Sequence, residues 1–212
     1  MRDQIIAYCE RTDFTYWSEP VNAVTNAAFL IAAACVWRQT SGIPLARAMA
    51  IVLVTIGLGS FLWHTHAARW ASLADVVPIL VFILLYLFAA TRDFLQLDRR
   101  FAFAAVLLFL PYAAVFSWGA GVLVSDLGAN AAYFSVAFLI AVYGLWLRHS
   151  QTGRGLLIGA LILVISLGFR MADDALCAVF PIGTHFMWHI LNGIMLAWMI
   201  HVYTRHQRKS AI

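Results

Sequence analysis

Apolar stretches of about 20 residues recur along the whole chain, and short clusters of charged residues separate them. A bilayer core about 30 Å thick needs about 20 helical residues to cross it. The stretches that qualify are 20–37, 44–64, 72–91, 101–118, 129–147, 155–172 and 184–204. The sequence therefore predicts an all-α fold, a bundle of seven transmembrane helices that forms a single domain over residues 1–212. The segment 117–130, which is rich in Gly and small residues, is predicted to be a loop.

The composition excludes several other classes of protein. Hydrophobic residues make up 63% of the chain and charged residues 11%. In a soluble domain, about half of the residues are hydrophobic and about a quarter are charged. A soluble enzyme, a disordered chain and a disulfide-dense secreted module are all excluded. The net charge of +4 comes from basic residues scattered at the ends of apolar stretches, so no nucleic-acid partner is expected.

The distribution of basic residues predicts the orientation. With seven spans, Arg2, Arg11, Arg69 and Arg170 fall on the side of the N-terminus. The other ten of the 14 Lys and Arg residues fall on the side of the C-terminus: Arg38, Arg47, Arg92, Arg99, Arg100, Arg148, Arg154, Arg205, Arg208 and Lys209. Because cytoplasmic loops carry the Lys/Arg excess, the C-terminus is predicted to be cytoplasmic and the N-terminus outside.

Ionisable residues gather at one end of three predicted spans. Ser60 and His64 end the second, Asp75 begins the third, and His185 and His189 begin the seventh. An ionisable group inside a span costs roughly 2.5–3.5 kcal/mol on insertion scales and persists when it is paired, hydrated or bound to a metal. The direction of each span places the three histidines and Asp75 at the outer end. Residues four apart share a helix face, so His185 and His189 can hold one ion.

This set of side chains predicts a hydrolytic metal site. Three imidazoles suit Zn²⁺ and leave its fourth position open for water, and zinc-bound water ionises near neutral pH and attacks carbonyl groups. Ser60 lies one turn before His64, where its hydroxyl could stabilise an oxyanion. Asp75 could take the proton of the water and pass it to the leaving group.

Simpler interpretations stay open for each residue. The two histidines of the seventh span could hydrogen-bond to neighbouring helices. Ser72 and Asp75 match the capping box S-x-x-D at a helix start. Ser60 could be a small packing residue. The co-location of three His and one Asp at one depth favours the metal site.

The same residues resemble the alkaline ceramidases, which belong to a seven-span hydrolase superfamily that includes the adiponectin receptors. The resemblance covers essentially the whole chain. It rests on Ser60 and His64, then Asp75, then His185, Trp188, His189, Leu191 and Gly193, together with Tyr8, Cys9, Glu10, Glu19, Asn22 and Asn26 and with Asp174 and Cys177.

The resemblance implies hydrolysis of the amide of ceramide, an N-acylsphingosine, to a sphingoid base and a fatty acid. It implies zinc on His64, His185 and His189, catalytic roles for Ser60 and Asp75, and a lipid substrate held within the bilayer. The small size and short loops suggest a bacterial inner-membrane protein with its site near the periplasmic side. The alternatives are hydrolysis of another ester or N-acyl lipid, and a receptor or transport module with a structural zinc.

The family also implies a calcium site and a disulfide. Eukaryotic relatives hold Ca²⁺ with a D-W-C-E-x-N segment and a later Glu. This chain keeps Glu10 and Glu19 but has Ala7 and Thr12 in place of the Asp and Asn, and Asp13 could compensate. Calcium takes six to eight oxygen ligands, so we expect it to bind weakly or not at all; the acidic residues could equally form a solvated loop.

The second implied feature is a disulfide between Cys9 and Cys177. Both cysteines are predicted to lie on the outer, oxidising side of the membrane, where such a bond persists.

Overall fold

The computed structural model describes residues 4–124, 127–128 and 130–210, which form a bundle of long helices with no strand, only an isolated bridge between Gln4 and Ala68. This confirms the predicted all-α class. The α-helices are α1 (Pro20–Thr25), α2 (Ala27–Trp37), α3 (Pro44–His66), α4 (Arg69–Ala89), α5 (Arg99–Leu123), α6 (Asn130–Trp146), α7 (Gln151–Leu176) and α8 (His185–Ser210). Short helical turns η1 (Arg38–Thr40) and η2 (Ala90–Phe94) extend α2 and α4.

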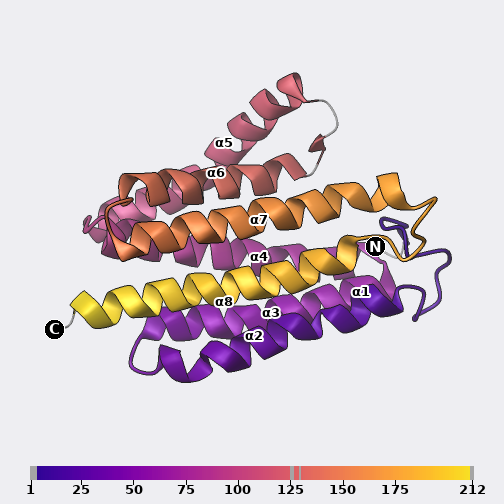
Figure 1. Cartoon of the computed structure of the whole chain (residues 1–212), viewed down its shortest axis with the longest axis horizontal. Coiled ribbons are helices and arrows are strands. Elements are labelled where there is room, and N and C mark those ends of the chain that lie inside the picture. Colours follow the sequence, from indigo (N-terminus) through magenta and orange to yellow (C-terminus); the bar gives the residue numbers. More distant parts are fainter. Residues whose placement is uncertain (1–3, 125–126, 129, 211–212) are drawn as a thin grey trace.

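Six of the helical segments in the described part of the chain are long and apolar enough to cross a membrane. They are Pro20–Thr40, Pro44–His66, Arg69–Phe94, Arg99–Leu123, Gln151–Leu176 and His185–Ser210. The remaining apolar helix, α6, has 17 residues. The two ends of the chain lie at opposite ends of the bundle (Figure 1). This arrangement is typical of a multi-pass membrane protein.

The ends of several helices differ from the predicted ones. The segment predicted as a loop from residue 117 is helical as far as Leu123, because a backbone in an apolar environment is satisfied best by its own helical hydrogen bonds, even at Gly119 and Gly121. This end of α5 diverges from the rest of the bundle (Figure 1). Helix α7 continues beyond the predicted end at residue 172, through Asp173 to Leu176. The predicted start of the fifth span, at residue 129, lies outside the described residues.

Helices α3 and α4 form a tight hairpin whose turn consists of Ala67 and Ala68. Ala67 adopts a left-handed conformation with φ 46°, and its amide donates to the carbonyl of Trp63 at 2.9 Å, which ends α3. Helix α4 begins at once at Arg69. Ser72 therefore lies inside α4 rather than at its N-cap, and the capping-box interpretation of Ser72 and Asp75 is wrong.

At Gly59, the backbones of α3 and α4 approach each other closely. A Cβ atom added at Gly59 would lie 2.0 Å from the carbonyl oxygen of Ala74, and this oxygen belongs to the backbone of α4. Ser60 follows Gly59 and Asp75 follows Ala74. The absence of a side chain at residue 59 therefore allows the two predicted catalytic residues to approach each other across the hairpin.

We predict that Gly59→Ala lowers the free energy of unfolding by about 1–3 kcal/mol, the usual cost of overpacking a tight contact. Thermal unfolding in detergent measures this effect. Gly168→Ala is the matched control, because a Cβ atom there meets nothing within 4 Å and Ala favours a helix by up to ~1 kcal/mol over Gly. Equal melting temperatures for the two variants would contradict the close approach.

Candidate metal centre

His64 from α3 and His185 and His189 from the start of α8 form one buried cluster. One ring nitrogen of each lies within 4.8 Å of those of the other two. The exposed fractions of the three residues are 1%, 2% and 1%. The structure thus brings together the three predicted metal ligands, and this buried group could bind a metal ion.

Each of these rings keeps one buried nitrogen without a hydrogen-bond partner among the described residues. The nitrogens are Nε2 of His64, Nδ1 of His185 and Nε2 of His189. A buried polar atom left unpaired costs about 1–3 kcal/mol, and here three occur side by side. A metal ion bound between the rings would satisfy all three, so the residues present fit such an ion.

The second ring nitrogen of His64 is held by an acidic residue. Nδ1 of His64 lies 2.5 Å from a carboxylate oxygen of Glu19. The other carboxylate oxygen of Glu19 accepts from Nε of Arg11, and Nη2 of Arg11 donates to the carbonyl of His64 at 2.7 Å. A carboxylate on the far nitrogen of a metal-binding histidine fixes its tautomer and ring orientation. Glu19 and Arg11 therefore leave Nε2 of His64 free for an ion.

Glu19 is suited to this role because it stays ionised. Burial opposes ionisation of its carboxyl group, but the contacts with His64 and with the Arg11 guanidinium outweigh burial and lower the pKa of Glu19. The resemblance implied a calcium ligand at this position. The structure instead gives Glu19 three nitrogen partners: Nε of Arg11, Nδ1 of His64, and Nδ2 of Asn22, which donates to it at 3.2 Å.

The other two histidines are also held from outside the cluster. Nδ1 of His189 lies 2.9 Å from the hydroxyl of Thr25, which donates to the carbonyl of Val21 and so accepts from the ring. Tyr8 stacks on the ring of His185, with 3.7 Å between centroids. Burial raises the pKa of Tyr8 to about 12, so its hydroxyl stays neutral at physiological pH.

Asp173 positions the start of α8, and the sequence analysis did not identify it as a site residue. One carboxylate oxygen accepts from the amides of Thr184 at 2.7 Å and His185 at 2.9 Å, and the other accepts from the amide of Cys9 at 3.0 Å. A carboxylate at a helix N-terminus satisfies unpaired amides and favours the helix dipole. Asp173 thus joins α7, α8 and the N-terminal segment beside the first metal ligand of α8.

A disulfide joins Cys9 to Cys177, as predicted. It ties the N-terminal segment to the residue that follows α7, and Asp173 on α7 contacts the same segment through the Cys9 amide. These two connections close the polar end of the bundle around the histidines.

Ser60 and Asp75 lie beside the histidine cluster. Ser60 is 4% exposed, and its hydroxyl interacts with the Asp75 carboxyl group. Asp75 is also within electrostatic range of His64 and Arg170. Ser60 on α3 and Asp75 on α4 therefore interact with each other, and Asp75 lies close enough to His64 for an electrostatic effect.

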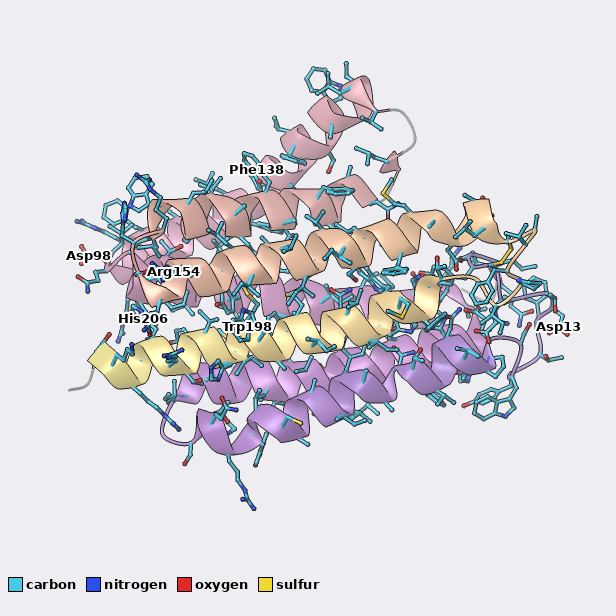
Figure 2. All side chains as sticks on the ribbon, viewed as in Figure 1. Asp13, Asp98, Phe138, Arg154, Trp198 and His206 are labelled. Atoms are coloured by element: carbon cyan, nitrogen blue, oxygen red, sulfur yellow. A yellow bond between two sulfur atoms is a disulfide. The ribbon has the colours of Figure 1, made fainter. Side chains whose placement is uncertain are left out.

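The acidic residues proposed for calcium have other partners. Glu10 accepts from the amides of Val21 at 2.7 Å and Asn22 at 2.8 Å, at the start of α1, and burial raises its pKa. Asp13 is exposed, and its hydrogen bonds to Thr15 lower its pKa. Figure 2 shows Asp13 at the outer edge of this end of the bundle. The three carboxylates do not converge on one point.

The guanidinium of Arg11 lies among oxygen atoms of the N-terminal segment that the resemblance implies as a calcium site. Arg11, 3% exposed, pairs with Glu19 and also directs Nη1 to the backbone carbonyls of Asp13 at 3.0 Å and Thr15 at 3.4 Å. Calcium needs six to eight oxygens, and its positive charge would lie beside that of Arg11. The residues present do not fit a calcium ion.

The chain matches no protein-family model and no curated protein. Its class therefore rests on its own features: a helical protein of the multi-pass membrane type with a buried group of three histidines at one end of the bundle.

We predict that added calcium or a calcium chelator leaves the melting temperature and the metal content of the purified protein unchanged. The physical reason is that Arg11 supplies the positive charge in this segment. Thermal unfolding with millimolar calcium and with a calcium-selective chelator measures this. Stabilisation that rises with calcium concentration and saturates at one ion per chain would contradict the expectation.

We predict that Glu19→Gln weakens metal binding about 10–100-fold, the usual effect of removing a carboxylate from the outer nitrogen of a metal-binding histidine. Titration with a competing chelator measures the affinity. Asp13→Asn is the matched control, since this exposed carboxylate contacts Thr15 and lies away from the histidines. The same loss in both variants, or none in Glu19→Gln, would show that Glu19 does not support His64.

Proposed function

We propose that this protein is a zinc-dependent hydrolase that cleaves the amide of a long-chain N-acyl lipid, with ceramide as the first substrate to test. The observation that carries the proposal is the buried group of His64, His185 and His189, with Ser60 and Asp75 beside it, next to an apolar cavity. Three imidazole ligands are typical of catalytic zinc and leave a position open for water. The resemblance to the alkaline ceramidases supports the choice of ceramide.

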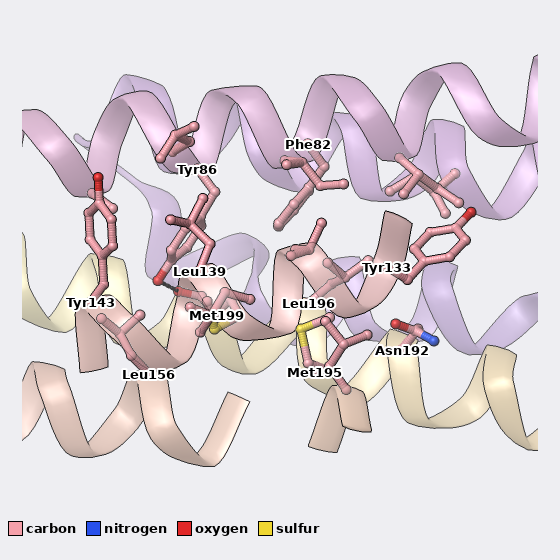
Figure 3. Close-up of a pocket in the computed structure, with 18 of the residues that line it drawn as sticks. Phe82, Tyr86, Tyr133, Leu139, Tyr143, Leu156, Asn192, Met195, Leu196 and Met199 are labelled. Atoms are coloured by element: carbon pink, nitrogen blue, oxygen red, sulfur yellow. Dashed lines mark hydrogen bonds between the residues drawn. The ribbon is translucent and has the colours of Figure 1, made fainter. Parts of the chain in front are cut away.

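The cavity lies inside the bundle and has a volume of about 90 Å³. It adjoins the histidine cluster: Phe29, which lines it, packs against His189, and Trp188 and Asn192 line it from the same end of α8. Tyr143 and Leu156 lie at the opposite end (Figure 3). Its walls are almost wholly apolar, and such walls suit a hydrocarbon tail.

A complete lipid tail is larger than this volume, since pockets for small ligands measure about 300–1,000 Å³. Admission of a lipid therefore requires the lining side chains or helices to separate. Tyr86 forms a fixed part of the wall, because its hydroxyl donates to the carbonyl of Met199 at 3.2 Å.

The orientation that we propose has seven spans, an outer N-terminus and a cytoplasmic C-terminus. The excess of Lys and Arg on the side of the C-terminus supports it. Figure 2 shows Arg154 and His206 at the end of the bundle opposite to Asp13. In a bacterial inner membrane this orientation puts the histidines near the periplasmic side, at the depth of a lipid amide just below the headgroups.

His64, His185 and His189 would hold the zinc, which would supply Lewis-acid polarisation of the amide carbonyl and an activated water. We propose that Asp75 accepts the proton of the attacking water and delivers it to the amide nitrogen as the C–N bond breaks. In this proposal, Ser60 donates a hydrogen bond to the oxygen on which negative charge develops. The acyl carbon gains the oxygen of water, and the products are a carboxylic acid and an amine.

We predict that the purified protein in detergent releases fatty acid from a labelled ceramide, and that a zinc chelator or His189→Ala abolishes the release. Asp75→Asn should lose turnover but keep one zinc per chain, because Asp75 moves protons and is not a ligand. Liquid chromatography of the products and metal analysis measure the two properties.

Near-normal turnover in Asp75→Asn would exclude its proton role. Absence of fatty acid release by a wild-type protein that holds one zinc per chain would contradict ceramide hydrolysis and direct the search to other acyl lipids or to a receptor role.

A further inference from the structure

Arg170 is a partly buried cation close to the end of α7, and the reaction proposed above does not use it. Its guanidinium lies over the ring of Tyr133, 5.0 Å from the centroid, and over the ring of Trp188 at 5.2 Å. Its Nη1 is buried and has no hydrogen-bond partner among the described residues. Among the described residues, Arg170 forms no ion pair with a carboxylate.

The surroundings of Arg170 place it between the cavity and the histidines. Tyr133 on α6 and Trp188 on α8, the two rings that it contacts, both line the cavity. Figure 3 shows Tyr133 at the end of the cavity that Asn192 also lines. The positive charge of Arg170 also acts on Asp75, His185 and His189. Arg170 is not itself among the described residues that line the cavity, but it contacts two that do and acts electrostatically on the polar site.

Arg170 interacts with the faces of two aromatic rings and with the hydroxyl of Tyr133, but its buried Nη1 still has no hydrogen-bond partner among the described residues. Contacts with ring faces stabilise the charge, but the N–H groups lie in the plane of the guanidinium and require oxygen acceptors of their own. A buried N–H group without an acceptor is costly. An acceptor supplied by a ligand would remove this cost, and the planar fork of Arg is best matched by a carboxylate.

We propose that Arg170 is the carboxylate-binding residue of this cavity, and that its ligand is a single-chain lipid carboxylate whose tail lies in the apolar cavity. Two sources share this chemistry: a free fatty acid, which is the product of the proposed hydrolysis, and the headgroup of an N-acyl amino acid, which would be a substrate. The assignment of the free fatty acid as a product rests on the proposed function; the binding itself does not.

The test is equilibrium binding to the metal-loaded protein in detergent, by isothermal titration calorimetry. The probes are palmitate, hexadecanol, which has the same tail length without a charge, and N-palmitoylglycine. The variants are Arg170→Gln, Arg170→Lys and Arg47→Gln. Arg47 is the matched control because it also lies over an aromatic ring, that of Trp37, 3.9 Å from the centroid, at the opposite end of the bundle.

We expect Arg170→Gln to weaken binding of the carboxylates at least tenfold while the affinity for hexadecanol and the metal content stay unchanged. Arg170→Lys should restore part of the affinity, and Arg47→Gln should match the wild type. A larger loss for palmitate identifies the free fatty acid as the ligand, and a larger loss for N-palmitoylglycine identifies an acidic headgroup.

Equal losses for palmitate and hexadecanol, or no loss for either carboxylate, would overturn the proposal. If Arg170→Gln does not fold, Arg170→Lys is the deciding variant. A partial loss of carboxylate affinity with unchanged hexadecanol binding supports the proposal. Full carboxylate affinity, or an equal loss for hexadecanol, overturns it. Carboxylate binding can be present in a protein that does not hydrolyse ceramide, and ceramide hydrolysis can occur without carboxylate binding at Arg170. The binding and activity measurements therefore test the two proposals separately.

Discussion

Three imidazole nitrogens that are buried without protein partners are the constraint on which the rest of this structure depends. A buried polar atom without a partner is costly inside an apolar bundle, and protonation of neighbouring rings would place like charges side by side. A shared metal ion resolves both problems. Much of the polar chemistry around His64, His185 and His189 consists of groups that hold these rings in the orientation that such an ion requires.

That support comes from segments far apart in the chain. Glu19 and Arg11 hold His64 from the N-terminal segment, and Thr25 on α1 holds His189. Asp173 on α7 fixes the first turn of α8, and the disulfide of Cys9 with Cys177 ties the same segments together. One end of the bundle is thus a cross-linked polar structure, whereas the interior beneath it is an apolar cavity. The combination suits a reaction on the polar group of a molecule that is otherwise hydrocarbon.

Much of this could be predicted from the sequence. The helical class followed from the apolar stretches, and the co-location of His64 with His185 and His189 followed from the direction of each span. The supporting residues could not be found in this way. Asp173 accepts from the backbone amides at the start of α8. Arg11 pairs with Glu19, eight residues later, and donates to the backbone of α3. Neither set of contacts belongs to a local sequence pattern. The capping-box interpretation failed because α3 and α4 meet in a two-residue turn, and only the three-dimensional structure shows that turn.

X-ray absorption spectroscopy at the zinc edge, on protein purified without added chelator, shows which metal the three histidines bind and with which ligands. The account predicts one zinc per chain with three imidazole nitrogens at about 2.0–2.1 Å and one oxygen ligand, and loss of this signal in His185→Ala. A zinc with sulfur ligands, or a fully folded protein that binds no metal after zinc is supplied, would contradict it.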